Sequence, residues 1–201
     1  MTRPRAPVTH LLYLHGFRSS PLSTKARIVG GWLAAHRPDV AWLCPQLPPS
    51  PAEAQRGVLA AVAGWPLETT GIVGSSLGGF YATVLAERLG PPCRAVLLNP
   101  AVDPARDLAR YVGELEAWHS SERFHFRAEY VDELRALTPP RLTGQDRYLA
   151  IVAKGDEVLD WREMSARYDG CHLALLEGSD HALSDFEHGQ LAQVLGFLGL
   201  A

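Results

Sequence analysis

The sequence lacks several features that define specialised classes of protein. No apolar stretch approaches the roughly 18 residues of a membrane-spanning helix, and no apolar leader segment follows the basic N-terminal residues. There is no run of like charges, and the net charge is −3 over 201 residues. This balance provides no basic surface for nucleic acid. We therefore expect a cytoplasmic protein with no membrane span and no nucleic-acid partner.

Cysteine is also scarce. The three cysteines, Cys44, Cys93 and Cys171, are widely spaced, and each lies in or beside an apolar run. Since no C-x-x-C spacing indicates a metal or redox pair, we predict three buried, reduced thiols. Internal repeats and low-complexity segments are absent too. With 47% hydrophobic and 20% charged residues the composition is that of a globular protein, and the length suits a single domain over residues 1–201.

What the sequence does contain is a regular alternation of short apolar runs and helical patterns. Six runs are predicted as strands, at residues 10–14, 40–44, 71–74, 95–98, 148–153 and 172–176. Helices are predicted at residues 21–36, 51–64 and 77–89, and capping signals at Ser20, Ser50, Asp160 and Ser184 mark helix starts. Apolar strands alternating with helices indicate an α/β fold, with a mostly parallel six-stranded sheet covered by helices on both faces.

The alternation is interrupted between the fourth and fifth strands. Residues 101–145 contain two helical patterns, at 105–118 and 128–137, and no obvious strand. We predict that this segment is a small helical cap insertion, which covers the carboxyl edge of the sheet.

The most informative stretch, residues 71–82 (GIVGSSLGGFYA), joins the third strand to the next helix. Ser76 has a glycine two residues away on each side, Gly74 and Gly78, which is the pattern G-x-S-x-G. On so sharp a turn the serine is held in a strained conformation that lifts its Oγ above the sheet. Its neighbours must be small because the strand and helix backbones pass close together. Ser76 is therefore a candidate nucleophile, which needs a base and an acid to activate it.

Candidate partners follow the fifth and sixth strands. Where this serine pattern is functional, the chain order is serine, acid, histidine, each at a strand end. Asp156 follows the fifth strand and His181 the sixth, so both order and placement fit. Asp160 is an alternative acid, but it also suits a helix N-cap. Glu157 and Asp180 are weaker alternatives, since Glu157 points away on a tight turn and Asp180 is adjacent to the histidine.

The other seven histidines are expected outside the chemical centre: His10, His15, His36, His119, His125, His172 and His188. An acyl-transfer centre also needs two backbone N–H groups for the developing oxyanion. Leu77 at the helix start and Phe17 in the loop after the first strand are placed to supply them. In that loop His15 is expected to brace the backbone. Arg18 either steers an anionic part of a substrate or is a solvated loop arginine.

Five blocks of sequence resemble those of YqiA-type small bacterial esterases, the UPF0227 group of the α/β-hydrolase superfamily. The blocks are residues 13–21 (YLHGFRSSP), 74–83 (GSSLGGFYAT), 98–102 (LNPAV), 155–160 (GDEVLD) and 178–181 (GSDH). The resemblance implies an α/β-hydrolase fold and a carboxylesterase that also cleaves acyl-CoA thioesters. Matched to these blocks, Ser76, Asp156 and His181 take the triad positions.

The expected function is therefore hydrolysis of a small-molecule ester or thioester through an acyl-enzyme, with no metal or organic cofactor required. Arg18, Tyr111 and Trp118 are candidate substrate-binding residues. Two alternatives remain open from the residues alone. The same triad could cleave another acyl bond, in a lactone or a small peptide, or the chain could be a non-catalytic binding protein on this fold.

Overall fold

Six strands form one parallel sheet in the computed structural model, which describes residues 6–116 and 123–201. The sheet has the order β2-β1-β3-β4-β7-β8, and every pairing in it is parallel. The strands are β1 (His10–Leu14), β2 (Ala41–Leu43), β3 (Thr70–Ser75), β4 (Arg94–Leu98), β7 (Tyr148–Ala153) and β8 (His172–Leu176). All six predicted strands are confirmed, and no strand end differs from the prediction by more than one residue.

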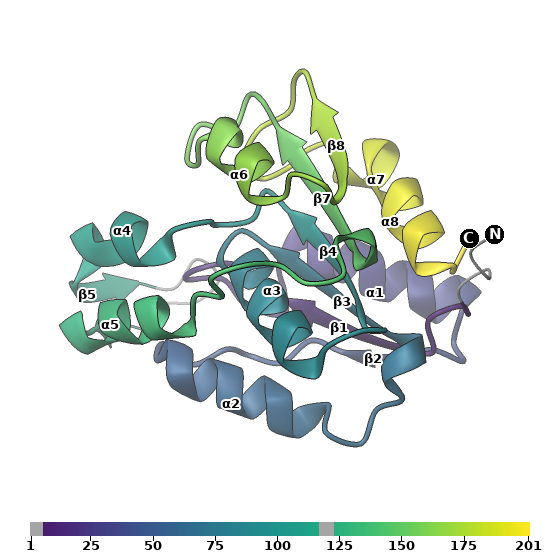
Figure 1. The fold of residues 1–201 in the computed structure, drawn as a ribbon, viewed down its shortest axis with the longest axis horizontal. Coiled ribbons are helices and arrows are strands. Elements are labelled where there is room, and N and C mark those ends of the chain that lie inside the picture. The colour runs from purple at the N-terminus through teal and green to yellow at the C-terminus, as the bar shows by residue number, and fades with distance from the viewer. Residues whose placement is uncertain (1–5, 117–122) are drawn as a thin grey trace.

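Helices cover both faces of the sheet (Figure 1). One face packs against α2 (Pro51–Ala61), α3 (Leu77–Leu89) and α6 (Trp161–Arg167), and the other against α1 (Thr24–His36), α7 (Phe186–Gly189) and α8 (Leu191–Leu198). The side chains of alternate residues in each strand pack on opposite faces of the sheet. In β1, Leu12 belongs to the first core and Tyr13 to the second, and both side chains are fully buried. A strand buried on both faces must be apolar throughout, which explains the uninterrupted apolar runs.

The segment between β4 and β7 lies at the end of the sheet opposite the chain termini (Figure 1), and it is only partly as predicted. Helix α5 (Ala128–Leu137) is confirmed. The helix predicted over residues 105–118 is wrong. Helix α4 (Pro104–Leu108) and a 3₁₀ turn (Ala109–Tyr111) lead into β5 (Gly113–Glu116), which pairs antiparallel with β6 (Arg123–Phe126). In this hairpin apolar and charged residues alternate, a period of two that favours strands over helix.

Two carboxylates attach this segment to the rest of the fold. Glu133 of α5 accepts hydrogen bonds from the Ser50 hydroxyl (2.7 Å) and the Ala52 N–H (2.9 Å), at the N-terminus of α2. Ser50 itself accepts from the Glu53 N–H, as its capping signal predicted. On the other side, Glu163 of α6 accepts hydrogen bonds from both terminal nitrogens of the Arg106 guanidinium, which belongs to α4.

Three further predictions need correction. Helix α1 begins at Thr24 rather than Pro21, because Ser20 closes a turn by accepting from the Leu22 and Ser23 N–H groups. Ser184 caps no helix, since its N–H and hydroxyl both donate to Asp180. The cysteines are free thiols as expected, but only Cys93 is buried, while the other two are partly exposed.

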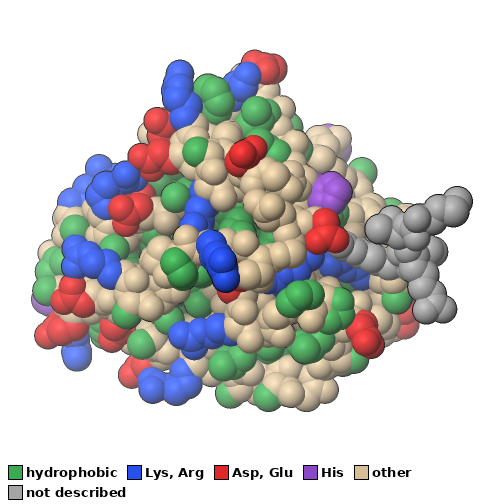
Figure 2. All heavy atoms as spheres, viewed as in Figure 1, with side chains coloured by type: hydrophobic (Ala, Val, Ile, Leu, Met, Phe, Trp, Pro, Cys, Tyr) green, Lys and Arg blue, Asp and Glu red, His purple; other side chains and the backbone are tan. Residues whose placement is uncertain are grey.

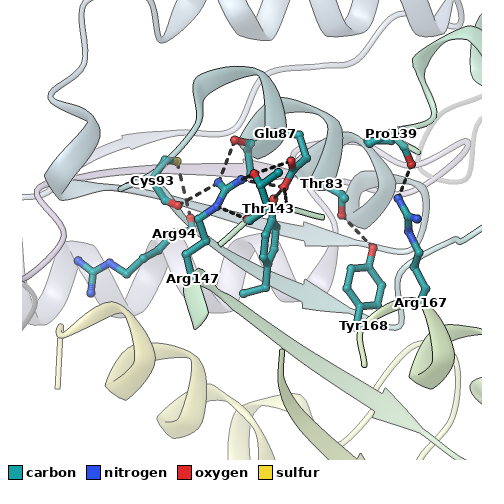
Figure 3. A network of polar contacts seen from close by, with 11 residues as sticks. Thr83, Glu87, Cys93, Arg94, Pro139, Thr143, Arg147, Arg167 and Tyr168 are labelled. Carbon is teal, nitrogen blue, oxygen red and sulfur yellow. Dashed lines mark hydrogen bonds and ion pairs between the residues drawn. The ribbon is translucent and has the colours of Figure 1, made fainter. Parts of the chain in front are cut away.

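A buried polar network holds the returning chain against α3 (Figure 3). Arg147 is 2% exposed and donates to the carbonyls of Ala86, Cys93 and Thr143, and it pairs with Glu87 at 2.8 Å. The guanidinium thereby binds the Ala86 carbonyl in the last turn of α3, where a cation is favoured. The network fixes the chain just before β7, whose carboxyl end carries Asp156.

The surface offers no concentration of one charge on the face drawn in Figure 2, where acidic and basic side chains are interspersed. Among residues 6–116 and 123–201, no helix is long and apolar enough to cross a membrane.

The network predicts a large stability loss on removal of its cation. Arg147→Met should lower the free energy of unfolding by about 3–5 kcal/mol, because it leaves the Glu87 carboxylate without its cation and removes the donor to three carbonyls. Denaturant unfolding followed by circular dichroism measures this. Arg37→Met is the control, since Arg37 pairs with Asp39 at the surface and should change stability little. Equal effects of the two variants would contradict this account.

Candidate functional site

Ser76 occupies a sharp turn between β3 and α3. Its backbone has φ 57° and ψ −120°, which is costly for a residue with a Cβ, by about 1–3 kcal/mol. The surrounding backbone maintains this conformation. The Ser76 N–H donates to Leu98 O, and its carbonyl accepts from the N–H groups of Gly79 and Ala101.

The two flanking glycines are required by backbone contact. A Cβ on Gly78 would lie 1.9 Å from Leu14 O, and one on Gly74 would lie 2.2 Å from Gly78 O. Neither obstacle is a movable side chain. Strand β3, helix α3 and the end of β1 therefore meet at a spacing that only glycine allows, as the G-x-S-x-G pattern predicted.

Ser76, His181 and Asp156 form a continuous chain of hydrogen bonds. His181 Nε2 lies 3.0 Å from Ser76 Oγ, and His181 Nδ1 lies 2.8 Å from Asp156 Oδ2. The Asp156 side chain is fully buried, whereas the histidine side chain is 20% exposed. The arrangement presents a serine hydroxyl to an imidazole whose other nitrogen faces a carboxylate, the geometry that nucleophilic acyl transfer needs.

The backbone around this chain is held by groups that the sequence did not single out. Asp156 Oδ1 accepts from the N–H groups of Val158 and Leu159, both at 2.8 Å. Asn99, at the end of β4, donates its amide to the carbonyls of residues 180 and 181 and accepts from the Ala153 N–H. The sequence signals for Asn99 were its place at a strand end before Pro100 and its position in the block LNPAV, and neither indicated these contacts.

The alternative acids have other partners. Asp160 caps α6 by accepting from the Arg162 N–H, and Asp180 accepts from Ser184. Glu157 reaches the His181 backbone N–H at 3.0 Å rather than its ring.

The histidines expected outside the centre do lie outside it where they are described. His15 is buried and braces its loop, since its Nε2 accepts from the Leu47 N–H and its Nδ1 lies 3.0 Å from Gly16 O. His125 pairs with Glu114 within the β5–β6 hairpin. His119 lies outside the described residues.

The two predicted oxyanion donors border the nucleophile. Phe17 and Leu77 both line the cavity into which Ser76 opens. Within residues 6–116 and 123–201, neither backbone N–H donates to another protein group. The adjoining loop is in contact with the serine, because a Cβ on Gly16 would lie 3.4 Å from Ser76 Cβ.

Two cavities meet at Phe17. The reactive cavity, of about 640 Å³, contains Ser76 and His181 and has basic side chains on its walls. The apolar cavity, of about 660 Å³, lies under the β5–β6 hairpin and α5. Its apolar lining includes Leu47, Tyr81, Phe124, Phe126 and Leu134. Phe17 lines both cavities, and its ring packs against the rings of Tyr111 (5.7 Å), Phe124 (6.3 Å) and Phe126 (5.3 Å).

The candidate substrate-binding residues differ in their placement. Tyr111 lines the reactive cavity. Arg18 lines both cavities and donates its Nε to Glu116 O, so it also holds the hairpin. Trp118 lies outside the described residues. Three further basic residues, which no sequence pattern marked, line the reactive cavity from α1 and from the segment after β4: Lys25, Arg106 and Arg110. In the described part of the chain, no group of three or more His, Cys, Asp or Glu residues is placed to hold a metal ion.

The close passage at the turn makes a direct prediction. Gly78→Ala should lower the free energy of unfolding by more than about 3 kcal/mol, because the new methyl group meets backbone that cannot rotate away. Gly57→Ala is the matched control, since Gly57 is exposed on α2 with nothing within 4 Å of its added Cβ. It should raise stability by about 0.5–1 kcal/mol. Thermal and denaturant unfolding would test both variants. A Gly78→Ala protein as stable as the unmodified one would refute the close backbone contact at this position.

Comparison with known proteins identifies the fold. Est1E from Butyrivibrio proteoclasticus superposes with a TM-score of 0.70 at 18% identity, over 97% of this chain and 88% of that one. The metagenome-derived lipolytic enzymes LipS and LipT give 0.69 at 20% identity, over 97% and 95% of the two chains. Mouse alpha/beta hydrolase domain-containing protein 10 gives 0.67 at 15% identity, over 92% and 86%. The fold is that of the α/β hydrolases. The sequence pattern of the "Uncharacterised protein family (UPF0227)" matches residues 10–199, and the chain therefore belongs to the UPF0227 family.

Proposed function

We propose that the protein is a serine carboxylic-ester hydrolase in which Ser76 is the nucleophile, His181 the base and Asp156 the orienting acid. The observation that carries the proposal is the hydrogen-bond chain from Ser76 Oγ through His181 to Asp156, with steps of 3.0 and 2.8 Å. It coincides with a strained serine turn in a fold whose solved relatives include esterases and lipolytic enzymes.

In the first half of the reaction, His181 Nε2 takes the Ser76 proton while Oγ attacks the ester carbonyl. The buried Asp156 carboxylate holds the imidazole through Nδ1 and stabilises its charged form. Because Asp156 Oδ1 is already engaged by two backbone N–H groups, only Oδ2 is directed at the ring. The imidazolium then gives its proton to the leaving alcohol, and an acyl-enzyme on Ser76 remains.

The developing oxyanion is received by the Phe17 and Leu77 N–H groups, which have no protein acceptor within the described residues. Leu77 stands at the N-terminus of α3, where the helix dipole also favours negative charge. In the second half, water activated by His181 attacks the acyl-enzyme, and the acid leaves with Ser76 restored. Each step uses groups of this chain alone, with no metal or organic cofactor.

The two cavities suggest how an ester is accommodated. The apolar cavity has room for an acyl chain, and it adjoins the nucleophile at Leu77 and Phe17. The reactive cavity, with Tyr111 and Arg18 on its wall, receives the remainder of the substrate. The same centre would attack an acyl-CoA thioester, since the carbonyl chemistry is shared and only the leaving group changes.

The nucleophile is tested by Ser76→Ala. Hydrolysis of p-nitrophenyl esters should fall by at least about 10³-fold, while the circular dichroism spectrum is retained because the backbone turn does not need the hydroxyl. A fluorophosphonate probe should label the native protein and not the variant. Unchanged turnover in Ser76→Ala would end the proposal, and a panel of esters, acyl-CoA thioesters, lactones and aminoacyl anilides would show which acyl bond is preferred.

The acid is tested by a matched pair of variants. Asp156→Asn should lower kcat by about 10³–10⁴-fold, because the amide no longer favours the imidazolium or the correct tautomer. Asp160→Asn should affect turnover only slightly, because Asp160 caps α6 and asparagine is an equally good cap. A larger loss in Asp160→Asn than in Asp156→Asn would reverse the assignment.

A further inference from the structure

The wall of the reactive cavity formed by the start of α1 carries donors that the proposed chemistry does not use. Ser23, Thr24 and Lys25 line this cavity together with Ser76 and His181. Helix α1 is 13 residues long, has no acidic residue in its first turn, and no side chain caps it. Its first N–H groups therefore have no side-chain acceptor, and the positive end of the helix dipole lies at this wall.

Buried hydroxyls converge on the same wall. Tyr13 is fully buried and lines the cavity, and its hydroxyl makes no hydrogen bond of normal geometry to a described residue; the same holds for the Ser23 hydroxyl. Ser23 and Ser75 are nevertheless near enough to Tyr13 to lower its pKa, although burial raises that pKa well above its usual value. Tyr13 thus remains protonated and can donate. An unpaired hydroxyl in a buried position costs free energy unless a ligand satisfies it.

Lys25 adds a positive charge to these donors. Its ammonium donates to Ala182 O, beside His181, and lines the cavity. Burial lowers the pKa of Lys25 to about 8, although Asp180 and Asp156 act in the opposite direction. Both carboxylates already have partners, Asp156 in His181 and two N–H groups, and Asp180 in Ser184. Among the described residues Lys25 forms an ion pair with neither carboxylate, so an anion in the cavity would add a charged partner to its bond with Ala182 O.

We propose that the start of α1, with Lys25 and the hydroxyls of Tyr13, Ser23 and Ser75, binds an anionic group of the substrate that Ser76 attacks. This group is a carboxylate or a phosphate, and its site is separate from the proposed oxyanion donors Phe17 and Leu77. The substrate class is an ester with an anionic group close to its scissile bond. The class rests on the proposed function, whereas the anion site itself does not.

Direct binding tests the site without reference to turnover. Inorganic phosphate and succinate are titrated into the protein by calorimetry at constant ionic strength, because general screening would otherwise mimic specific binding. At least one anion should bind, and the tighter of the two identifies phosphate or carboxylate as the preferred group. Lys25→Met should weaken that binding by roughly tenfold or more, and Lys25→Arg should largely restore it.

The chain offers a matched control, because Lys154 is its only other lysine. Lys154 pairs with Glu177 and lines neither cavity, so Lys154→Met should bind the anion like the unmodified protein. Tyr13→Phe removes only the buried hydroxyl and should also weaken binding, which keeps the test decisive if Lys25→Met does not fold. No binding of either anion, or equal weakening by the Lys25 and Lys154 variants, would overturn the proposal.

Kinetics then test the substrate class. 4-Nitro-3-(butanoyloxy)benzoate and 2-nitrophenyl butyrate share one acyl chain and a nitrophenol leaving group, and only the first carries a carboxylate, on the leaving group that the reactive cavity receives. After subtraction of the rate with Ser76→Ala, the carboxylate-bearing ester should have the higher kcat/KM, and Lys25→Met should lower the ratio of the two by roughly tenfold. Ser76-dependent turnover without that preference would reject the anionic substrate and leave the esterase proposal intact. Anion binding without Ser76-dependent turnover would support the anion site and reject the esterase proposal.

Discussion

The contact on which the site depends is the close passage of three backbones around Ser76. Gly78 of α3 lies against the carbonyl of Leu14 at the end of β1, and Gly74 of β3 lies against Gly78. Because no side chain fits between them, the serine turn, the start of α3 and the loop after β1 are fixed relative to one another. The strained conformation of Ser76 is held by the bond that its N–H donates to Leu98 O at the end of β4 and by the bond that its carbonyl accepts from the Ala101 N–H.

The parallel sheet accounts for the rest of the proposed centre. The carboxyl ends of its strands meet at one edge, so residues far apart in sequence become neighbours: Ser76 after β3, Asn99 after β4, Asp156 after β7 and His181 after β8. Asn99 is the link among them, since one side chain engages the end of β7 and the two carbonyls around His181. The backbone of His181 is held by Asn99 at its carbonyl and by Glu157 at its N–H. Its ring is held between Ser76 and Asp156.

In the proposed function, substrate specificity depends on what surrounds that edge. Strand β6 and α5 contribute to the lining of an apolar cavity, whereas α1, which packs on the opposite face of the sheet, contributes a polar wall to the reactive cavity. Phe17 lines both cavities, and its N–H is a proposed oxyanion donor. A substrate that joins an apolar acyl chain to a polar group would therefore meet matching surroundings on both sides of Ser76.

The sequence by itself determined the six strands of the parallel sheet, most helices and the candidate residues of the centre, because those depend on local patterns: apolar runs, glycine spacing and strand-end order. It failed at residues 105–118, where a helical pattern was favoured over the alternation that forms β5, and at the start of α1, where Ser20 makes a turn instead of a cap. The tertiary structure alone decided the roles of Asn99, Glu133 and Lys25. Their partners lie more than 50 residues away in the chain, and no local pattern encodes contacts made only when distant segments pack together.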